Sequence, residues 1–376
     1  MSELINERHS GQNLHWQLLT SVSALTLLAA AAGSNESKAA DQDTVRPTVW
    51  IELGVQLEQV SGFGDPFVPP FTHEIVADGF TSPAELQRAL SQSFGGESRI
   101  SFQPENSDWV FSASVLYGRA NGQKATHEET PGGLRLIHLG SHSGSFTPIH
   151  STVKFSQSRI DNSETHTVLD FQAGKDIGLG LFNTKGESTF SFGVRFAQFT
   201  SKQAFGLIAD PDFYFPTNAK YKKYHHTYTV ASHMERSFRG LGPSLSWNAS
   251  ASLIGNTNDG GITLDWGVNA AFLFGRRKAS GHHQTESVFY KSNAFEGYHL
   301  TTHFQRSGNP DRSRTVIVPN LGGFAGASFR FSNAKVSLGY RGDFFFGAMD
   351  TGIEATRQTT TGFYGPFATV SVGLGG

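Results

Sequence analysis

The sequence has 376 residues, with 30 lysines and arginines against 32 aspartates and glutamates, so the near-zero net charge of −2 gives no basic footprint for nucleic acid. Cysteine is absent, which excludes zinc–thiolate sites, thiol nucleophiles and lipoprotein anchoring through an amino-terminal cysteine. Charged residues make up only 16%, while glycine (42) and phenylalanine (32) are abundant and the mean hydropathy is −0.29. This composition fits a chain in which apolar residues alternate with polar ones.

An apolar run near the amino terminus predicts export. Residues 18–32, LLTSVSALTLLAAAA, have the length of a signal-peptide hydrophobic region and are too short to span a membrane as a helix. We expect residues 1–40 to be a signal peptide with a short tail and residues 41–376 to form one domain; a short uncleaved helix is the alternative. No other apolar run approaches the roughly 20 residues of a spanning helix. A membrane-spanning form would therefore be a closed barrel, which hydrogen-bonds every backbone group.

The strongest pattern along the rest of the chain is alternation with a period of two. In residues 262–274, apolar positions from Ile262 to Phe274 lie on one face, and Thr263 and Asp265 lie on the other. The apolar face is rich in aromatics and the polar face in glycine, serine and charge, as in barrels whose apolar face meets lipid. We predict an all-β fold, an antiparallel transmembrane β-barrel of about ten strands (8–12) with long outer loops; a soluble β-sandwich is the alternative. Strands are expected at 48–60, 96–103, 108–120, 164–177, 187–200, 225–254, 262–277, 316–331, 334–347 and 361–374.

The connections between these strands alternate between short and long, as periplasmic turns and outer loops do in outer-membrane barrels. Both termini then lie at the short-turn end. The strand at 225–254 is unusually long, and Gly240, Gly242 and Pro243 predict either a kink or a turn that splits it. Within the outer loop 61–95, Pro83 after a capping residue predicts a short helix.

Two stretches resemble a known family. Residues 238–245, FRGLGPSL, and the Gly-rich strand from Asn320 followed by VSLGYR at 336–341 are similar to the Legionella-type major outer membrane protein family. The resemblance covers about the carboxy-terminal half and implies a pore-forming outer-membrane protein. Such barrels usually end in an aromatic residue, whereas this sequence ends VGLGG. The sequence is then either short by a residue or two, or an internal aromatic such as Phe367 substitutes.

Charged residues of both signs fall on the polar faces of the predicted strands. If a channel exists, they would line it and set its ion preference; alternatively, they pair across a closed interior, because ten strands are near the size that side chains can fill. The candidate lumen-lining residues are Glu52, Arg195, Glu235, Arg239, Asp265, Arg330, Lys335, Arg341 and Asp343.

The sequence predicts a pore or channel for small solutes, and the alternative is a closed structural or adhesive barrel whose long loops bind partners. No hydrolase elbow, zinc-protease motif or phosphate loop occurs, so we expect no enzyme, no cofactor and no metal site. Metal binding by the loop pair His299 and His303, or a protease site near Asp210, is a weaker alternative. Expected partners are the lipid bilayer, lipopolysaccharide and the outer-membrane assembly machinery. The sequence leaves the oligomeric state open.

Overall fold

The computed structural model describes eleven segments of the chain. These are residues 49–62, 92–104, 107–130, 154–176, 186–210, 212–215, 222–256, 260–293, 297–308, 311–352 and 356–374. All of them belong to the compact unit that spans residues 47–376. The predicted signal peptide and the predicted helix after Pro83 lie outside the described residues. Within these segments there is no helix that is long and apolar enough to cross a membrane.

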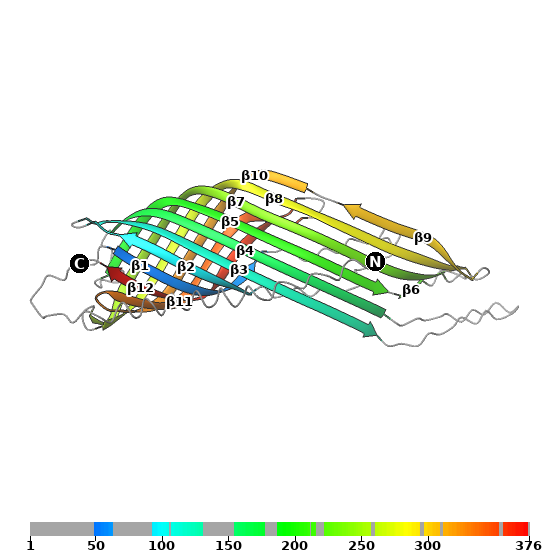
Figure 1. The fold of residues 1–376 in the computed structure, drawn as a ribbon, viewed down its shortest axis with the longest axis horizontal. Coiled ribbons are helices and arrows are strands. Elements are labelled where there is room, and N and C mark those ends of the chain that lie inside the picture. Colours follow the sequence, from blue (N-terminus) through cyan, green and yellow to red (C-terminus); the bar gives the residue numbers. More distant parts are fainter. Residues whose placement is uncertain are drawn as a thin grey trace, which may run out of the picture. The chain divides into compact units, whose positions relative to one another are not determined.

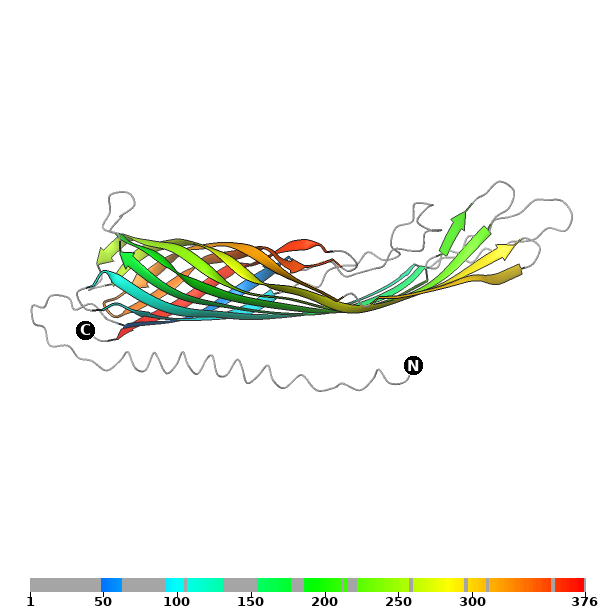
Figure 2. The same cartoon turned by 90° about the horizontal axis from the view of Figure 1, so that it is seen from above.

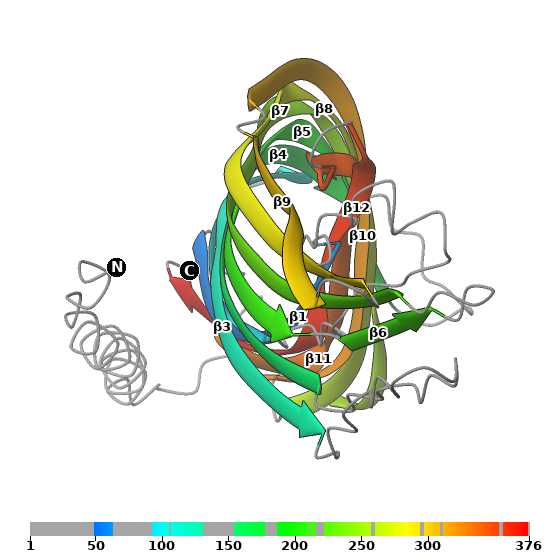
Figure 3. The same ribbon diagram turned by 90° about the vertical axis from the view of Figure 1, so that its right-hand side faces the viewer.

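Ten strands form a closed antiparallel barrel (Figures 1 and 3). Two further strands, β6 and β9, pair only with the distal parts of β7 and β8, where they continue the lines of β5 and β10. Pairing of β1 with β12 closes the ring. The strands are β1 (Val49–Ser61), β2 (Gln92–Phe102), β3 (Trp109–Thr130), β4 (Lys154–Asp176), β5 (Gly186–Asp210), β6 (Asp212–Phe215), β7 (Lys222–Asn256), β8 (Gly260–Asn293), β9 (Gly297–Gly308), β10 (Asp311–Arg330), β11 (Ala334–Asp350) and β12 (Gln358–Leu374).

The predicted fold class and the number of ring strands are confirmed. Gly240 to Pro243 do not split their strand, because β7 runs without a break and its irregularity lies later, between Ser252 and Ile254. Several strands are longer than predicted: β3, β4, β5, β7 and β8 run beyond the ends of β1, β2 and β12 (Figure 2). Sequence alternation missed these extensions because both of their faces carry many polar residues.

All the short connections lie at one end of the barrel, which we call the short-turn end; the opposite end is the long-loop end. The β10–β11 turn is closed by a hydrogen bond from the Phe331 N–H to the Ala334 carbonyl. Gly255 and Gly260 flank the β7–β8 turn with φ angles of 82° and 100°, which favour glycine because it lacks a Cβ. The described ends Val49 and Leu374 pair at this same end.

The polarity of the two barrel faces is inverted relative to a soluble protein. Large apolar side chains on the outer face are exposed, for example Phe272 (57%) and Leu338 (62%), whereas Arg195 and Asp265 on the inner face are 5% and 6% exposed. Trp109, which begins β3, and Tyr117 farther along it are both exposed outward, as interface aromatics are in membrane barrels. An apolar surface of this extent requires an apolar environment. The chain therefore has the architecture of an outer-membrane β-barrel.

Candidate functional site: the barrel interior

Seven of the nine candidate lumen residues lie on the inward face. This follows from the alternation of the strands and from the cavities that these residues line. Most of them lie in the half of the barrel nearer the short-turn end. The seven are Glu52, Arg195, Asp265, Arg330, Lys335, Arg341 and Asp343.

The other two candidates, Glu235 and Arg239, lie on the outer face. In β7 the buried, inward residues have even numbers, such as Met234, Arg236 and Phe238. Arg239 is exposed and its guanidinium lies 5.4 Å from the centre of an outward-facing phenylalanine ring. The expectation was wrong because this part of β7 lies beyond the lipid-facing band, where outward positions are polar and inward positions include Phe238 and Met234.

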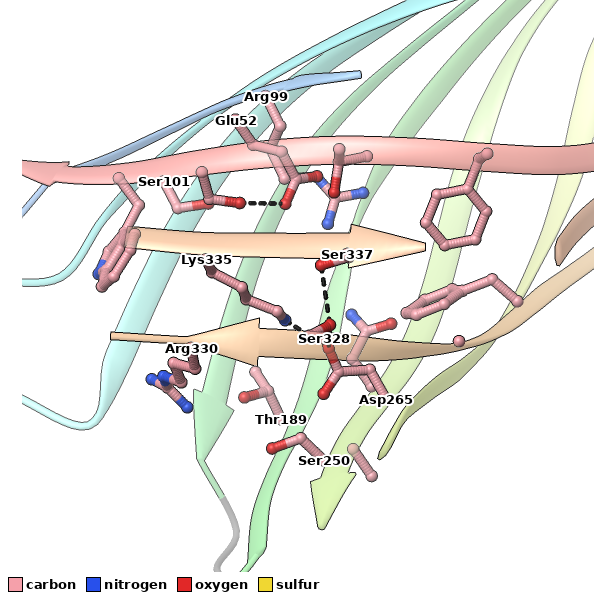
Figure 4. Close-up of a pocket in the computed structure, with 18 of the residues that line it drawn as sticks. Glu52, Arg99, Ser101, Thr189, Ser250, Asp265, Ser328, Arg330, Lys335 and Ser337 are labelled. Atoms are coloured by element: carbon pink, nitrogen blue, oxygen red, sulfur yellow. Dashed lines mark hydrogen bonds and ion pairs between the residues drawn. The ribbon is translucent and has the colours of Figure 1, made fainter. Parts of the chain in front are cut away.

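A polar cavity of about 300 Å³ occupies the short-turn end of the interior (Figure 4). The Lys335 ammonium lies 2.6 Å from a carboxylate oxygen of Asp265, which also accepts a hydrogen bond from the Ser328 hydroxyl. Across the cavity, the Ser371 hydroxyl donates to Glu52 at 2.8 Å. The remaining charged lining residues are Arg99, Arg330 and Arg341. The cavity could hold a small polar or charged molecule at this end of the barrel.

A belt of buried charges lies farther inside. The Arg195 guanidinium makes two hydrogen bonds to Asp170, at 2.7 and 2.8 Å, and others to Asn269 (2.6 Å) and Asn320. It also lies 3.6 Å from Asp343, which belongs to β11 on the far side of the ring from β5. Arg195 therefore connects opposite walls of the barrel.

A second arginine completes this belt. Arg341 on β11 is hydrogen-bonded and ion-paired to Glu97 on β2, three strands away around the ring. Its guanidinium also lies 4.9 Å from the centre of the Phe367 ring and 5.8 Å from that of Phe324. Phe367 thus points into the barrel. The two arginines of the belt thus lie within 4 Å of three carboxylates, and the cavity of about 60 Å³ among them is small.

An aromatic cluster fills the interior on the long-loop side of the belt. Phe199 on β5 contacts Phe345 on β11 and Phe363 on β12, with ring centres 4.5 and 5.3 Å apart. Phe238 stacks on Phe199 from the next strand at 5.8 Å. All four rings are at most 3% exposed. Because β5 and β12 are opposite in a ring of ten, these contacts span the full width of the barrel at this level.

A buried acid–base pair adjoins the aromatic cluster. Glu58 Oε2 lies 3.1 Å from His166 Nε2, and both side chains are nearly inaccessible, at 0% and 2% exposure. The His166 ring packs on Phe363 with centres 3.9 Å apart. Glycines make the room: a Cβ at Gly118 would lie 2.1 Å from His166, and a Cβ at Gly95 would lie 2.5 Å from Glu58. Glu58 therefore reaches over β2 and β3 to a partner on β4.

Sequence reasoning missed the aromatic cluster and the Glu58–His166 pair. The sequence held one signal for Glu58: it is an even-numbered residue of β1, like Glu52, and the alternation of the strand therefore places it on the inward face. Within the described residues no group of three or more histidine, aspartate or glutamate side chains is arranged to hold a metal ion. His299, His303 and Asp210 have side chains outside the described set.

No protein-family model matches the sequence, and no curated protein matches it either. Among solved structures, the fold is similar to that of the outer membrane protease OmpT from Escherichia coli, at 10% identity and a TM-score of 0.39, over 91% of this chain and all of that one. A variant of the monoaromatic hydrocarbon channel TodX matches 88% of this chain and 91% of its own length, at 6% identity and a TM-score of 0.24. The transport unit of the autotransporter AIDA-I from Escherichia coli matches over 94% and 98% respectively, at 9% identity and a TM-score of 0.20.

Proposed function

We propose that this chain is a closed, non-conducting and non-catalytic barrel of the outer membrane, which carries its extended strands as a contact surface outside the cell. The observation that carries the proposal is the contact of Phe199 with Phe345 and Phe363 across the barrel. The bilayer and the outer-membrane assembly machinery are the partners that such a barrel requires. Membership of the Legionella-type family stays a prediction.

Two successive layers support closure of the interior. A hydrated ion that entered at the short-turn end would meet the belt, in which the Arg195 and Arg341 guanidinium groups are already hydrogen-bonded to Asp170 and Glu97. It would then meet rings that offer no hydrogen-bonding group to replace lost water, and an unpaired charge in such surroundings is very costly. Passage would require both layers to move.

Strand extensions support the proposed contact surface. Residues 124–127 of β3 pair with residues 157–160 of β4, beyond the level of the last pair of β1 with β12 at Ser61. The short-turn end would face the periplasm, since outer-membrane barrels place their short turns there. The extensions would then project from the outer surface.

Among the described residues, the buried pair of Glu58 and His166 most resembles a catalytic acid–base pair. Its burial supports a non-catalytic role. A general base must come within hydrogen-bonding distance of the proton that it removes. Neither side chain is more than 2% exposed, so the surrounding rings would keep a substrate from this couple. Purified protein should therefore leave a mixed peptide library uncleaved, and cleavage abolished by H166A would contradict this assignment.

Closure is testable in planar bilayers. Pure refolded protein with heat-modifiable gel migration should give no discrete conductance steps. The absence of cysteine allows a second test, because a single Lys335→Cys lies in the cavity at the short-turn end. In vesicles, a small charged maleimide should label it only from that end. Ser332→Cys at the short turn and Gln123→Cys at the opposite end are exposed positions that report orientation.

A pore for small solutes is the second candidate, and the polar cavity of about 300 Å³ favours it. In that case the aromatic cluster would be a gate. Conductance steps from the wild-type protein, or labelling of Lys335→Cys from both ends, would replace closure with this function. For the contact surface, replacing residues 121–163, which include the extensions of β3 and β4, by a short glycine–serine linker should reduce aggregation of cells that display the protein. Unchanged aggregation and surface attachment would count against that role.

A further inference from the structure

The outer face of the barrel changes from apolar to polar within a single step along the strands. Directly paired outward positions on six neighbouring strands form a row that we call the apolar row, and at the centre of this row Leu241 and Phe274 are 54% and 56% exposed. Because each member pairs with the next, the register fixes the row without reference to side-chain positions. The apolar row consists of Val115, Leu169, Phe196, Leu241, Phe274 and Ile317.

The next two outward rows toward the long-loop end carry four cations and no carboxylate. The first comprises Tyr117, Thr167, Gln198, Arg239, Arg276 and Thr315; the second comprises Arg119, Thr165, Thr200, Ser237, Lys278 and Ser313. We call these twelve positions the cationic border. Its remaining members are hydroxyl and amide side chains, which can donate further hydrogen bonds.

The centre of the cationic border places two like charges side by side. Arg239 and Arg276 are direct partners on β7 and β8, and both are exposed. The Arg239 guanidinium lies over the Phe196 ring at 5.4 Å, and Arg276 Nε donates to the Ser313 hydroxyl at 2.6 Å. Lys278 lies one step farther along the same face of β8. Like charges directly opposite each other in a sheet are destabilising.

The carboxylate nearest to this centre by register already has a partner. Glu235 is one row beyond the cationic border, and its carboxylate lies 3.6 Å from the Lys202 ammonium. The inner belt cannot compensate either, because its acids lie on the opposite face of the wall. An external anion at the border would offset the repulsion between Arg239 and Arg276.

We propose that the cationic border binds the phosphates of lipopolysaccharide in the outer leaflet, with Arg239 and Arg276 as the central pair. Guanidinium groups match phosphate oxygens in charge and geometry. The acyl chains of the same molecule would lie on the apolar row, one step toward the membrane centre. A lipid with two phosphates on one disaccharide can also reach neighbouring strands, which are spaced about 4.8 Å apart. This site is on the outer face, so its existence does not depend on whether the interior is closed.

The direct test is binding of lipid A to the folded protein in detergent, measured by native mass spectrometry. Wild-type protein should retain bisphosphorylated lipid A at least about tenfold more tightly than the same lipid without phosphates. Exposed charge pairs contribute modestly one by one, so we expect R239Q/R276Q to weaken binding of bisphosphorylated lipid A roughly tenfold. Binding of the phosphate-free lipid should not change.

Lys175→Gln is the matched control, since Lys175 is exposed on the outer face at the short-turn end, and it should bind like wild type. Inorganic phosphate at millimolar concentration should not displace the lipid; complete displacement would indicate a site for a free anion instead. Equal affinity of wild-type protein for lipid A with and without phosphates overturns the proposal without any variant. Full retention of phosphate-dependent binding by R239Q/R276Q overturns the assignment of these residues.

Discussion

Replacing Arg195 by leucine should destabilise the barrel more than any other single change of charge in the belt. The leucine would leave Asp170 without its cation and Asp343 with only Arg341 nearby, and it would remove a hydrogen-bond donor from both Asn269 and Asn320. Removing one partner of a buried ion pair typically costs about 3–5 kcal/mol. The adjoining cavity of about 60 Å³ can admit little water to the stranded carboxylates. We therefore expect a loss of about 3 kcal/mol in the free energy of unfolding.

A double-mutant cycle separates the pair from the packing. R195L/D170L should recover about half of the loss, because replacing both partners removes one uncompensated charge. The matched surface pair is Arg159 and Asp161, whose side chains are 66% and 42% exposed. R159A should cost less than about 1 kcal/mol, since exposed pairs contribute little.

The assay is equilibrium unfolding in urea from lipid vesicles, followed by tryptophan fluorescence. The m-value must be unchanged for the free energies to be compared. A loss below about 1 kcal/mol for R195L, or strict additivity of R195L and D170L, would refute the reasoning. Either result would mean that Arg195 is solvated in the lumen and does not connect its walls.

Three further predictions use the same unfolding assay. G118A should lose about 1–3 kcal/mol, because its Cβ would lie 2.1 Å from the buried His166 ring and overpacked sites cost this much; an unchanged midpoint would show that the ring can move aside. F199A should lose about 3–5 kcal/mol, as buried Phe→Ala changes do. F272A, on the lipid-facing surface, should lose less than half as much free energy of unfolding as F199A, because lipid can fill the space that the ring leaves. Equal losses for F199A and F272A would show that Phe199 is not part of a packed core.

The ring of ten strands could be predicted because side chains in a strand alternate between lipid and lumen. That rule also places Arg195 and Asp265 inside from the sequence alone. It fails for Glu235 and Arg239, since beyond the apolar row the outward positions of β7 are polar and the inward ones include Phe238 and Met234. Strand extensions escaped prediction for the same reason.

The aromatic cluster could not be predicted, because it depends on which strands face each other across the closed ring. Phe199 follows Phe196 in β5, so the sequence there shows aromatic residues on both faces and does not indicate which ring meets another wall. Only the strand order brings Phe199 to Phe345. The room that Gly118 leaves for His166 is likewise a property of three adjacent strands.

The seam between β1 and β12 joins residues that are among the farthest apart in the described chain. Ser371 and Glu52, which share a hydrogen bond there, are separated by 319 positions. The other ring pairs join strands much nearer in sequence, so most of the sheet can assemble locally, while the seam bears the largest loop-closure entropy. Closure at β1 and β12 should therefore be the slow step of insertion. Until then both strands present open edges, and the barrel is at its most vulnerable to aggregation.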